Sequence, residues 1–245
     1  MRLSSRLPLA ALACFGLAAI LPAEEGPALP AAGADGFITI FNGKDLTYWG
    51  GLPEFWEVKD GVISGHETKD KSKQTFLTFA KPVSDFELHC QYKFATPDGN
   101  SGIQFRSKLM DPATWRVGGY QADFDSNRGY DGSIYDEAGI AGGRNTMSNR
   151  GEKTVWDAEN KRHNEKLADS ADALKGFIKQ GDWNDVVLIA NGNHVTYSIN
   201  GHVTTDLTDE SPKALTEGVL AFQVHAGFTM EIQIKDVKIK FLDKK

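Results

Sequence analysis

Hydrophobic and polar positions alternate along most of this chain after residue 36, and the most informative alternation runs from Leu220 to His225. Leu220, Phe222 and Val224 fall on one face of the predicted strand, whereas Gln223 and His225 fall on the other. The first face is that of an ordinary core strand. The second carries an amide and an imidazole, and a second buried face does not normally hold such groups without a use.

Two other predicted strands have the same two-sided pattern. In each, aromatic and aliphatic residues alternate with hydrogen-bonding side chains. The polar positions are Gln104 and Arg106 in residues 102–107, and Gln121, Asp123 and Asp125 in residues 120–125. Three strands with one apolar and one polar face predict a sheet whose outer face is a polar binding site.

Turn-forming residues divide the rest of the chain into short strands, with strong hairpin signals at Asn191-Gly192-Asn193 and Asn200-Gly201. The pattern predicts an all-β antiparallel sandwich or jelly roll. We expect its strands at residues 37–41, 56–58, 62–64, 75–79, 86–94, 102–107, 120–125, 133–135, 183–190, 194–199, 203–207, 218–225 and 230–241.

Residues 139–182 differ from this pattern because they are polar and poor in β-branched runs. They contain one predicted helix at about residues 170–179, with Ser170 as its N-cap and Gly181 near its C-terminal end. The segment is too polar to bury a core of its own. We therefore expect a long excursion from the sheet, not a second domain.

The N-terminal segment has the features of an export signal. Arg2 and Arg6 precede an apolar run over residues 7–20, and Ala23 is a small residue at a cleavage position. We expect a signal peptide at 1–23, a disordered Ala/Pro/Gly-rich lead-in at 24–35 and one domain at 36–245, in a periplasmic or extracellular protein. A lipoprotein anchored at Cys14 is the less favoured alternative, and the apolar run is too short for an integral membrane protein.

Charge and motifs narrow the function. The formal net charge is -6 and no basic run is present, which disfavours nucleic acid as a partner. The sequence has no phosphate loop, dinucleotide fingerprint, nucleophile elbow or His-Glu-x-x-His zinc motif. After cleavage Cys90 is the single cysteine, so no intramolecular disulfide is expected, and its alternation with apolar residues indicates core.

His225 is the leading candidate for chemistry, because imidazole takes or gives a proton near neutral pH. Arg106 suits the binding of sugar hydroxyls or of an oxyanion, and an ion pair with Asp123 or Asp125 is its structural alternative. Asp123 suits orienting Arg106, ligating a cation or accepting a proton. A calcium ion within residues 123–131 is an unspecific alternative.

A further cluster lies in residues 132–137, where the alternation places Tyr135 and Glu137 on one side and Asp136 on the other. Two carboxylates and a phenol suit acid–base chemistry, and they suit a solvated sheet edge equally well. The side of the strand on which each carboxylate lies ranks Glu137 slightly above Asp136 as a candidate for this chemistry.

Taken together and in order, the motifs of residues 36–242 resemble the 3-keto-disaccharide hydrolase family, long known as a domain of unknown function. The resemblance implies a concanavalin-like jelly roll and a glycoside substrate whose glucosyl unit is oxidised to a ketone at C3. The motifs are Phe41-Asn42-Gly43-Lys44-Asp45-Leu46 with Trp49, Trp56 with Val58-Lys59-Asp60-Gly61, Asp85-Phe86-Glu87-Leu88, Gly99-Asn100-Ser101-Gly102-Ile103 with Phe105-Arg106, Gly119-Tyr120-Gln121-Ala122-Asp123, Gly132-Ser133-Ile134-Tyr135-Asp136-Glu137, Gly181-Asp182-Trp183-Asn184, Asn200-Gly201, Gln223-Val224-His225-Ala226-Gly227 and Ile234-Lys235-Asp236-Val237-Lys238-Ile239.

The implied substrate gives the candidate residues roles. A C3 ketone acidifies the C2 proton, so a base can remove it and the C1 aglycone can leave by elimination, after which water can add. We expect His225 to be the base or the acid and Glu137 or Asp123 to be its complement, with Arg106 facing the C3 oxyanion. The expected hydroxyl-binding residues are Gln104, Gln121, Tyr135 and Gln223.

Three further expectations follow from the resemblance. A divalent metal ion is an alternative means of polarising the ketone. An oxidoreductase that makes the 3-keto sugar is the expected functional partner. The rival to an enzyme is a non-catalytic, lectin-like carbohydrate-binding module, because sandwiches of this kind often only bind sugar.

Overall fold

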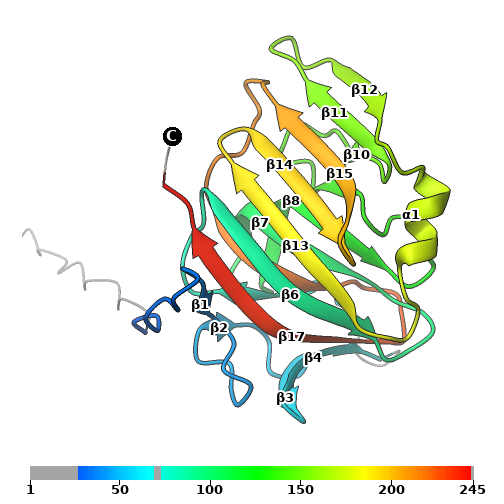
Figure 1. Cartoon of the computed structure of the whole chain (residues 1–245). Helices are drawn as coiled ribbons and strands as arrows, with labels where there is room; N and C mark the ends of the chain where they lie inside the picture. The colour runs from blue at the N-terminus through cyan, green and yellow to red at the C-terminus, as the bar shows by residue number, and fades with distance from the viewer. Residues whose placement is uncertain (1–26, 69–72, 244–245) are drawn as a thin grey trace, which may run out of the picture.

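A computed structural model describes residues 27–68 and 73–243, and its strands form two sheets packed face to face (Figure 1). The predicted all-β sandwich is therefore confirmed. The predicted signal peptide at 1–23 lies outside the described residues. Residues 27–35 form no helix or strand, and Leu29 packs against the core. Among the described residues, no helix is long and apolar enough to cross a membrane.

The larger sheet contains ten strands, with β1 (Ile38–Thr39) paired to β17 beside the main path. Its one parallel pair among the described strands is β11 with β15. In spatial order the main path is β12 (Arg162–Lys166), β11 (Glu152–Trp156), β15 (His202–Asp209), β14 (His194–Ile199), β13 (Asn184–Asn191), β6 (Phe86–Phe94), β17 (Met230–Phe241), β4 (Val62–Glu67) and β3 (Trp56–Lys59).

The smaller sheet contains seven strands, and all its pairs are antiparallel. The two central strands, β8 and β7, carry most of the predicted polar positions. In spatial order the sheet is β10 (Thr146–Ser148), β9 (Ile134–Glu137), β8 (Arg116–Asp125), β7 (Asn100–Asp111), β16 (Val219–Val224), β5 (Thr75–Phe79) and β2 (Trp49–Gly50).

The core fills the space between the sheets and follows from strict alternation. β6 buries every second side chain from Phe86 to Phe94, including the free Cys90. The Tyr92 ring stacks on Phe124 of β8 with the ring centroids 3.8 Å apart, which ties the two sheets together. Such a sandwich leaves the outer face of each sheet available for other tasks.

The expectation for residues 139–182 was wrong in one respect. The segment is not an excursion from the sheets, because β10 extends the smaller sheet while β11 and β12 extend the larger one. Met147 of β10 and Trp156 of β11 bury apolar side chains in the core, which anchors this polar segment to the two sheets. The helix prediction is confirmed, since α1 (Ala171–Phe177) is capped by Ser170, whose side chain accepts from the Ala173 N–H.

The outer face of the smaller sheet is divided in two. At one end Phe76, Val117 and Ala221 form a small apolar cluster. The β7–β8 hairpin contacts β5 there, through a hydrogen bond from Thr75 Oγ1 to the Thr114 carbonyl (3.0 Å). Because β16 separates β7 from β5 in the sheet, the hairpin must cross its outer face. The other end stays open, and it carries the polar rows.

Candidate functional site

A cavity of about 330 Å³ opens at the polar end of this outer face. Five of the predicted site residues line it together: Asp123, Glu137, His225, Gln121 and Tyr135. Strand register explains the grouping, because Gln121 of β8 lies opposite Tyr135 of β9. The other lining residues are Gln74, Asn100, Tyr130 and Ala138.

A directed chain of hydrogen bonds supports the wall of the cavity. Ser107 Oγ donates to Gln104 Oε1 (2.7 Å), and Gln104 Nε2 donates to Gln121 Oε1 (2.6 Å). Gln121 Nε2 then uses its two hydrogens on Asp123 Oδ1 (2.7 Å) and Gln223 Oε1 (3.2 Å). The chain fixes the orientation of the Gln121 amide.

Gln104 and Gln223 therefore do not have the predicted role of direct hydroxyl contacts. Both are fully buried, and neither lines the cavity. They hold Gln121 from behind. Gln121 and Tyr135 do reach the cavity, where hydroxyl binding is open to them.

Asp123 is a buried carboxyl group with a pKa well above its ordinary value. Burial is the largest cause, because it removes the hydration that the charged form needs, and the hydrogen bond from Gln121 offsets it only in part. The negative charges of Glu137, Asp131 and Asp125 raise the pKa further. Burial therefore favours the neutral form of Asp123, from which a proton can be donated.

Glu137 is held at the cavity by two donors from different elements. Arg116 NH2 lies 2.8 Å from its Oε1, and Gln74 Nε2 donates to the same oxygen over 2.9 Å. The neighbouring Asp136 faces the other way and accepts backbone N–H groups of Ala141 and Gly143. The predicted facing is confirmed, and it makes Asp136 a structural residue.

His225 directly follows β16 and is half-buried against Phe228. Its Nδ1 lies 2.7 Å from the carbonyl oxygen of Ala226. A carbonyl oxygen only accepts, so Nδ1 must carry the hydrogen. In the neutral ring Nε2 then has a free lone pair, which is the form that accepts a proton.

Arg106 lies elsewhere, so the prediction that it faces an oxyanion is wrong. A β-bulge between Phe105 and Lys108 adds one residue to β7, and Arg106 takes a positive φ of 49° there. The bulge shifts the alternation, and Ser107 takes the place beside Gln104. The buried guanidinium instead pairs with Asp85 (2.6 Å), which also differs from the predicted alternative partners Asp123 and Asp125.

The lining residues Gln74 and Tyr130 were missed by sequence reasoning, since each lies outside the strands in a polar stretch without alternation. Asn100 had a signal, because it stands in one of the motifs that carry the family resemblance. Arg116 was missed as the partner of Glu137, because it lies in the part of β8 beyond the predicted strand.

The acidic segment 123–131 does not offer a cation a ready set of ligands. The carboxylate of Asp125 accepts the backbone N–H groups of Asn127, Gly129 and Tyr130, and Asp131 accepts from the Tyr92 hydroxyl. Within residues 27–68 and 73–243, no group of three or more His, Cys, Asp or Glu residues is placed to hold a metal ion.

The fold and the cavity define a lectin-like β-sandwich with a polar site on one outer face. Solved structures agree on this fold. A candidate glycosyl hydrolase from Parabacteroides distasonis is 21% identical, with a TM-score of 0.57 over 86% of this chain and 95% of that one. The carbohydrate-binding module CBM66 from Bacillus subtilis is 13% identical, with a TM-score of 0.52 over 79% and 95%.

The family follows from the sequence match. Residues 36–240 match the model of the 3-keto-alpha-glucoside-1,2-lyase-like domain, and the chain belongs to this family. A 3-keto-disaccharide hydrolase from Bacteroides thetaiotaomicron is 39% identical over 80 residues. That match covers 29% of this chain and 27% of the relative's length.

Proposed function

We propose that this protein cleaves 3-keto-glycosides, and that the cavity lined by Asp123, Glu137 and His225 is its active site. The observation that carries the proposal is that one polar cavity is lined both by an imidazole, whose Nδ1 is bound to the Ala226 carbonyl so that Nε2 is left open, and by a buried carboxyl group with a raised pKa. A glycoside-acting family gives this pair a substrate. A protein that only bound sugar would not need both a proton donor and a proton acceptor in its cavity.

In the proposed reaction His225 Nε2 removes the proton at C2 of the 3-keto sugar. The electron pair of the C2–H bond forms the C2–C3 double bond of an enolate, whose oxygen carries the negative charge. Collapse of the enolate forms the C1–C2 double bond and breaks the C1–O bond to the aglycone. The proton of Asp123 passes to the departing oxygen, and water added to the unsaturated sugar would complete a net hydrolysis.

The enolate oxygen needs donors, and Arg106 does not supply them. The side-chain amides of Gln74 and Asn100 line the cavity, as do the hydroxyls of Tyr130 and Tyr135. We assign the enolate oxygen to this group of neutral donors. Because Asp123 is the acid–base complement of His225 in this reaction, we assign Glu137, held by Arg116 and Gln74, to binding the sugar hydroxyls.

The test is aglycone release from a 3-keto-glucoside and from its unoxidised parent. We expect release from the keto sugar only, and a loss of at least about a hundredfold in His225→Ala, the usual worth of a general base. His194→Ala is the matched control, because that imidazole pairs with Asp206 on the larger sheet. Full turnover in His225→Ala with an unchanged fold would refute the assignment.

A carbohydrate-binding module without catalysis is the second candidate, supported by the likeness of fold to CBM66. It predicts sugar binding with no aglycone release from any 3-keto-glycoside.

Two further proposals accompany the proposed enzyme. The first is an oxidoreductase that makes the C3 ketone upstream, and the second is export directed by residues 1–23. Mass determination of the mature N-terminus after expression in a Gram-negative host tests the second of these.

A further inference from the structure

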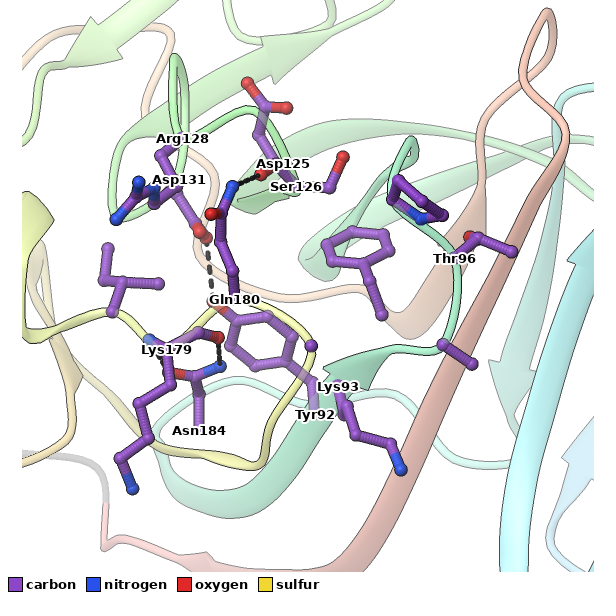
Figure 2. Close-up of a pocket in the computed structure, with 15 residues that line it drawn as sticks. Tyr92, Lys93, Thr96, Asp125, Ser126, Arg128, Asp131, Lys179, Gln180 and Asn184 are labelled. Atoms are coloured by element: carbon purple, nitrogen blue, oxygen red, sulfur yellow. Dashed lines mark hydrogen bonds between the residues drawn. The ribbon is translucent and has the colours of Figure 1, made fainter.

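A second and larger cavity, of about 540 Å³, lies where β6 and β8 end and the chain returns from α1 (Figure 2). It shares no lining residue with the cavity of Asp123 and His225. The buried side chains of Tyr92, Phe94 and Ile178 contribute the apolar part of its lining. A concave site of this size and mixed lining is typical of small-molecule binding.

The lining includes a buried hydroxyl that lacks a partner. Ser126 is 7% exposed, and its Oγ has no hydrogen-bond partner among the described residues. The Nε of Arg128, another lining residue, is also buried and unpartnered. Buried polar groups are normally hydrogen-bonded, so a ligand with hydroxyls or other polar groups fits here.

The cations of this cavity have no carboxylate partners. Lys93, Arg128 and Lys179 all line it, and none forms an ion pair with another described residue. Lys93 instead lies over the Trp183 ring at 4.9 Å, and Lys179 Nζ reaches the Trp183 carbonyl at 3.5 Å. Figure 2 shows these two lysines on either side of the Tyr92 ring.

The acidic residues of the cavity form no ion pairs with these cations. Asp125 accepts three backbone N–H groups, and Asp131 accepts the Tyr92 hydroxyl over 2.9 Å. Because three cations and two acids line the cavity, the lining keeps an excess of positive charge in a chain whose formal net charge is -6. An anionic group is what such a mouth attracts.

We propose that this cavity is a second carbohydrate site that binds a sugar unit carrying an anionic group. A hydroxyl of the sugar would pair with Ser126 Oγ, and Lys93, Arg128 and Lys179 would supply the positive potential around its anionic group. The proposal stands independently of the reaction at the first cavity. It gives the protein a site for an acidic sugar that is separate from the site proposed to act on a neutral sugar.

The experiment is a titration of the whole mature chain, followed by NMR shifts, with glucuronate, glucose 6-phosphate, glucose and acetate. We expect one or both anionic sugars to bind at least about tenfold more tightly than glucose and acetate, with affinity falling as salt rises. The two anionic sugars distinguish a carboxylate from a phosphate ligand. Equal binding of acetate, equal binding of glucose, or no binding of either anionic sugar would overturn the proposal.

Substitutions of lining residues test whether the anionic sugar binds in this cavity. Lys93→Met and Ser126→Ala should each weaken the anionic sugar about three- to tenfold, in line with the loss of one ligand hydrogen bond. Lys235→Met is the matched control, because its Nζ lies 4.2 Å from the same Trp183 ring but outside the cavity. Equal loss in Lys235→Met would refute the site. Cleavage of a neutral 3-keto-glucoside should be unchanged in all three, which separates this test from that of the proposed function.

Discussion

Gln121 donates a hydrogen bond from Nε2 to Oδ1 of the buried Asp123, its neighbour two residues along the same face of β8, over 2.7 Å. Oδ1 is thereby fixed as an acceptor, so the proton of the neutral acid resides on Oδ2. The amide can make this bond only in one orientation, which Gln104 enforces from the opposite strand. The orientation of the acid is therefore set in part by Gln104, a buried amide that does not line the cavity.

Gln104→Met tests this positioning. The change removes the donor to Gln121 Oε1, so the Gln121 amide is free to turn its oxygen toward Asp123. We expect kcat to fall about tenfold with little change in KM, and the acidic limb of the pH–rate profile to move. Gln233→Met is the matched control, because that amide bonds Glu231 on the larger sheet. A merely structural Gln104 would lower stability and leave the pH profile in place.

Asp123→Asn should separate activity from stability. The raised pKa of Asp123 means that the folded state holds a proton that the unfolded chain releases above pH 3.8. The free energy of unfolding of the native protein therefore falls as the pH rises above that value, and the variant lacks this loss. We expect the variant to be the more stable protein at pH 8 by thermal unfolding, with aglycone release reduced at least about a hundredfold. A less stable variant at pH 8 would contradict the proposed protonation.

The Arg106→Met variant should have a lower free energy of unfolding than the native protein, with unchanged turnover per folded molecule. Its guanidinium bonds Asp85 and the carbonyls of Ser84 and Gly192, so it joins the smaller sheet to a turn of the larger one. Removing one partner of a buried ion pair costs about 3–5 kcal/mol, because the other charge is left uncompensated.

Denaturant unfolding measures this loss, and turnover per folded molecule measures the chemistry. The control is Arg162→Met, whose ion pair with Glu152 is about one-quarter exposed on both sides and should cost under about 1 kcal/mol. A large fall in turnover per folded Arg106→Met molecule would restore its predicted role at the oxyanion.

The different outcomes for Gln121 and Arg106 show which site residues could be placed from strand alternation alone. Alternation depends only on the two-residue period of a strand, so the polar faces of β8 and β16 and the grouping of Asp123 with His225 were predictable. The bulge in β7 interrupts that period, and nothing in the residues around Arg106 announces it. The one extra residue in β7 places Ser107, instead of Arg106, beside Gln104 on the outer face.

The burial of the polar side chains could not be predicted from the sequence. Gln104 and Gln223 were correctly placed on the polar face, but their burial depends on the neighbouring strands. Strand pairing between distant segments is not encoded locally, which is also why β11 was not predicted to join β15 in parallel. The sequence could therefore predict the faces of the sheet but not the depth of the groups on them.

Asp131→Asn is the clearest test of buried acidity outside the active site. Burial, the largest cause, raises the pKa of Asp131 to about 7, although the hydrogen bond from Tyr92 acts in the opposite direction. Between pH 3.8 and about 7 the folded state keeps a proton that the unfolded chain loses, so the free energy of unfolding declines across this window and then levels off. Replacement by Asn keeps an acceptor for Tyr92 and removes the titrating group.

We therefore expect wild type and Asp131→Asn to differ little near pH 4, and the variant to gain stability steadily up to pH 7. The gain is at most about 4 kcal/mol, from 1.36 kcal/mol for each pKa unit. Denaturant unfolding from pH 4 to 8 measures it, with the exposed Asp98→Asn as the control, for which a flat difference is expected. If the Asp131→Asn difference stays flat as well, Asp131 is charged in the folded protein, and its carboxylate would then oppose the binding of an anionic sugar in the second cavity.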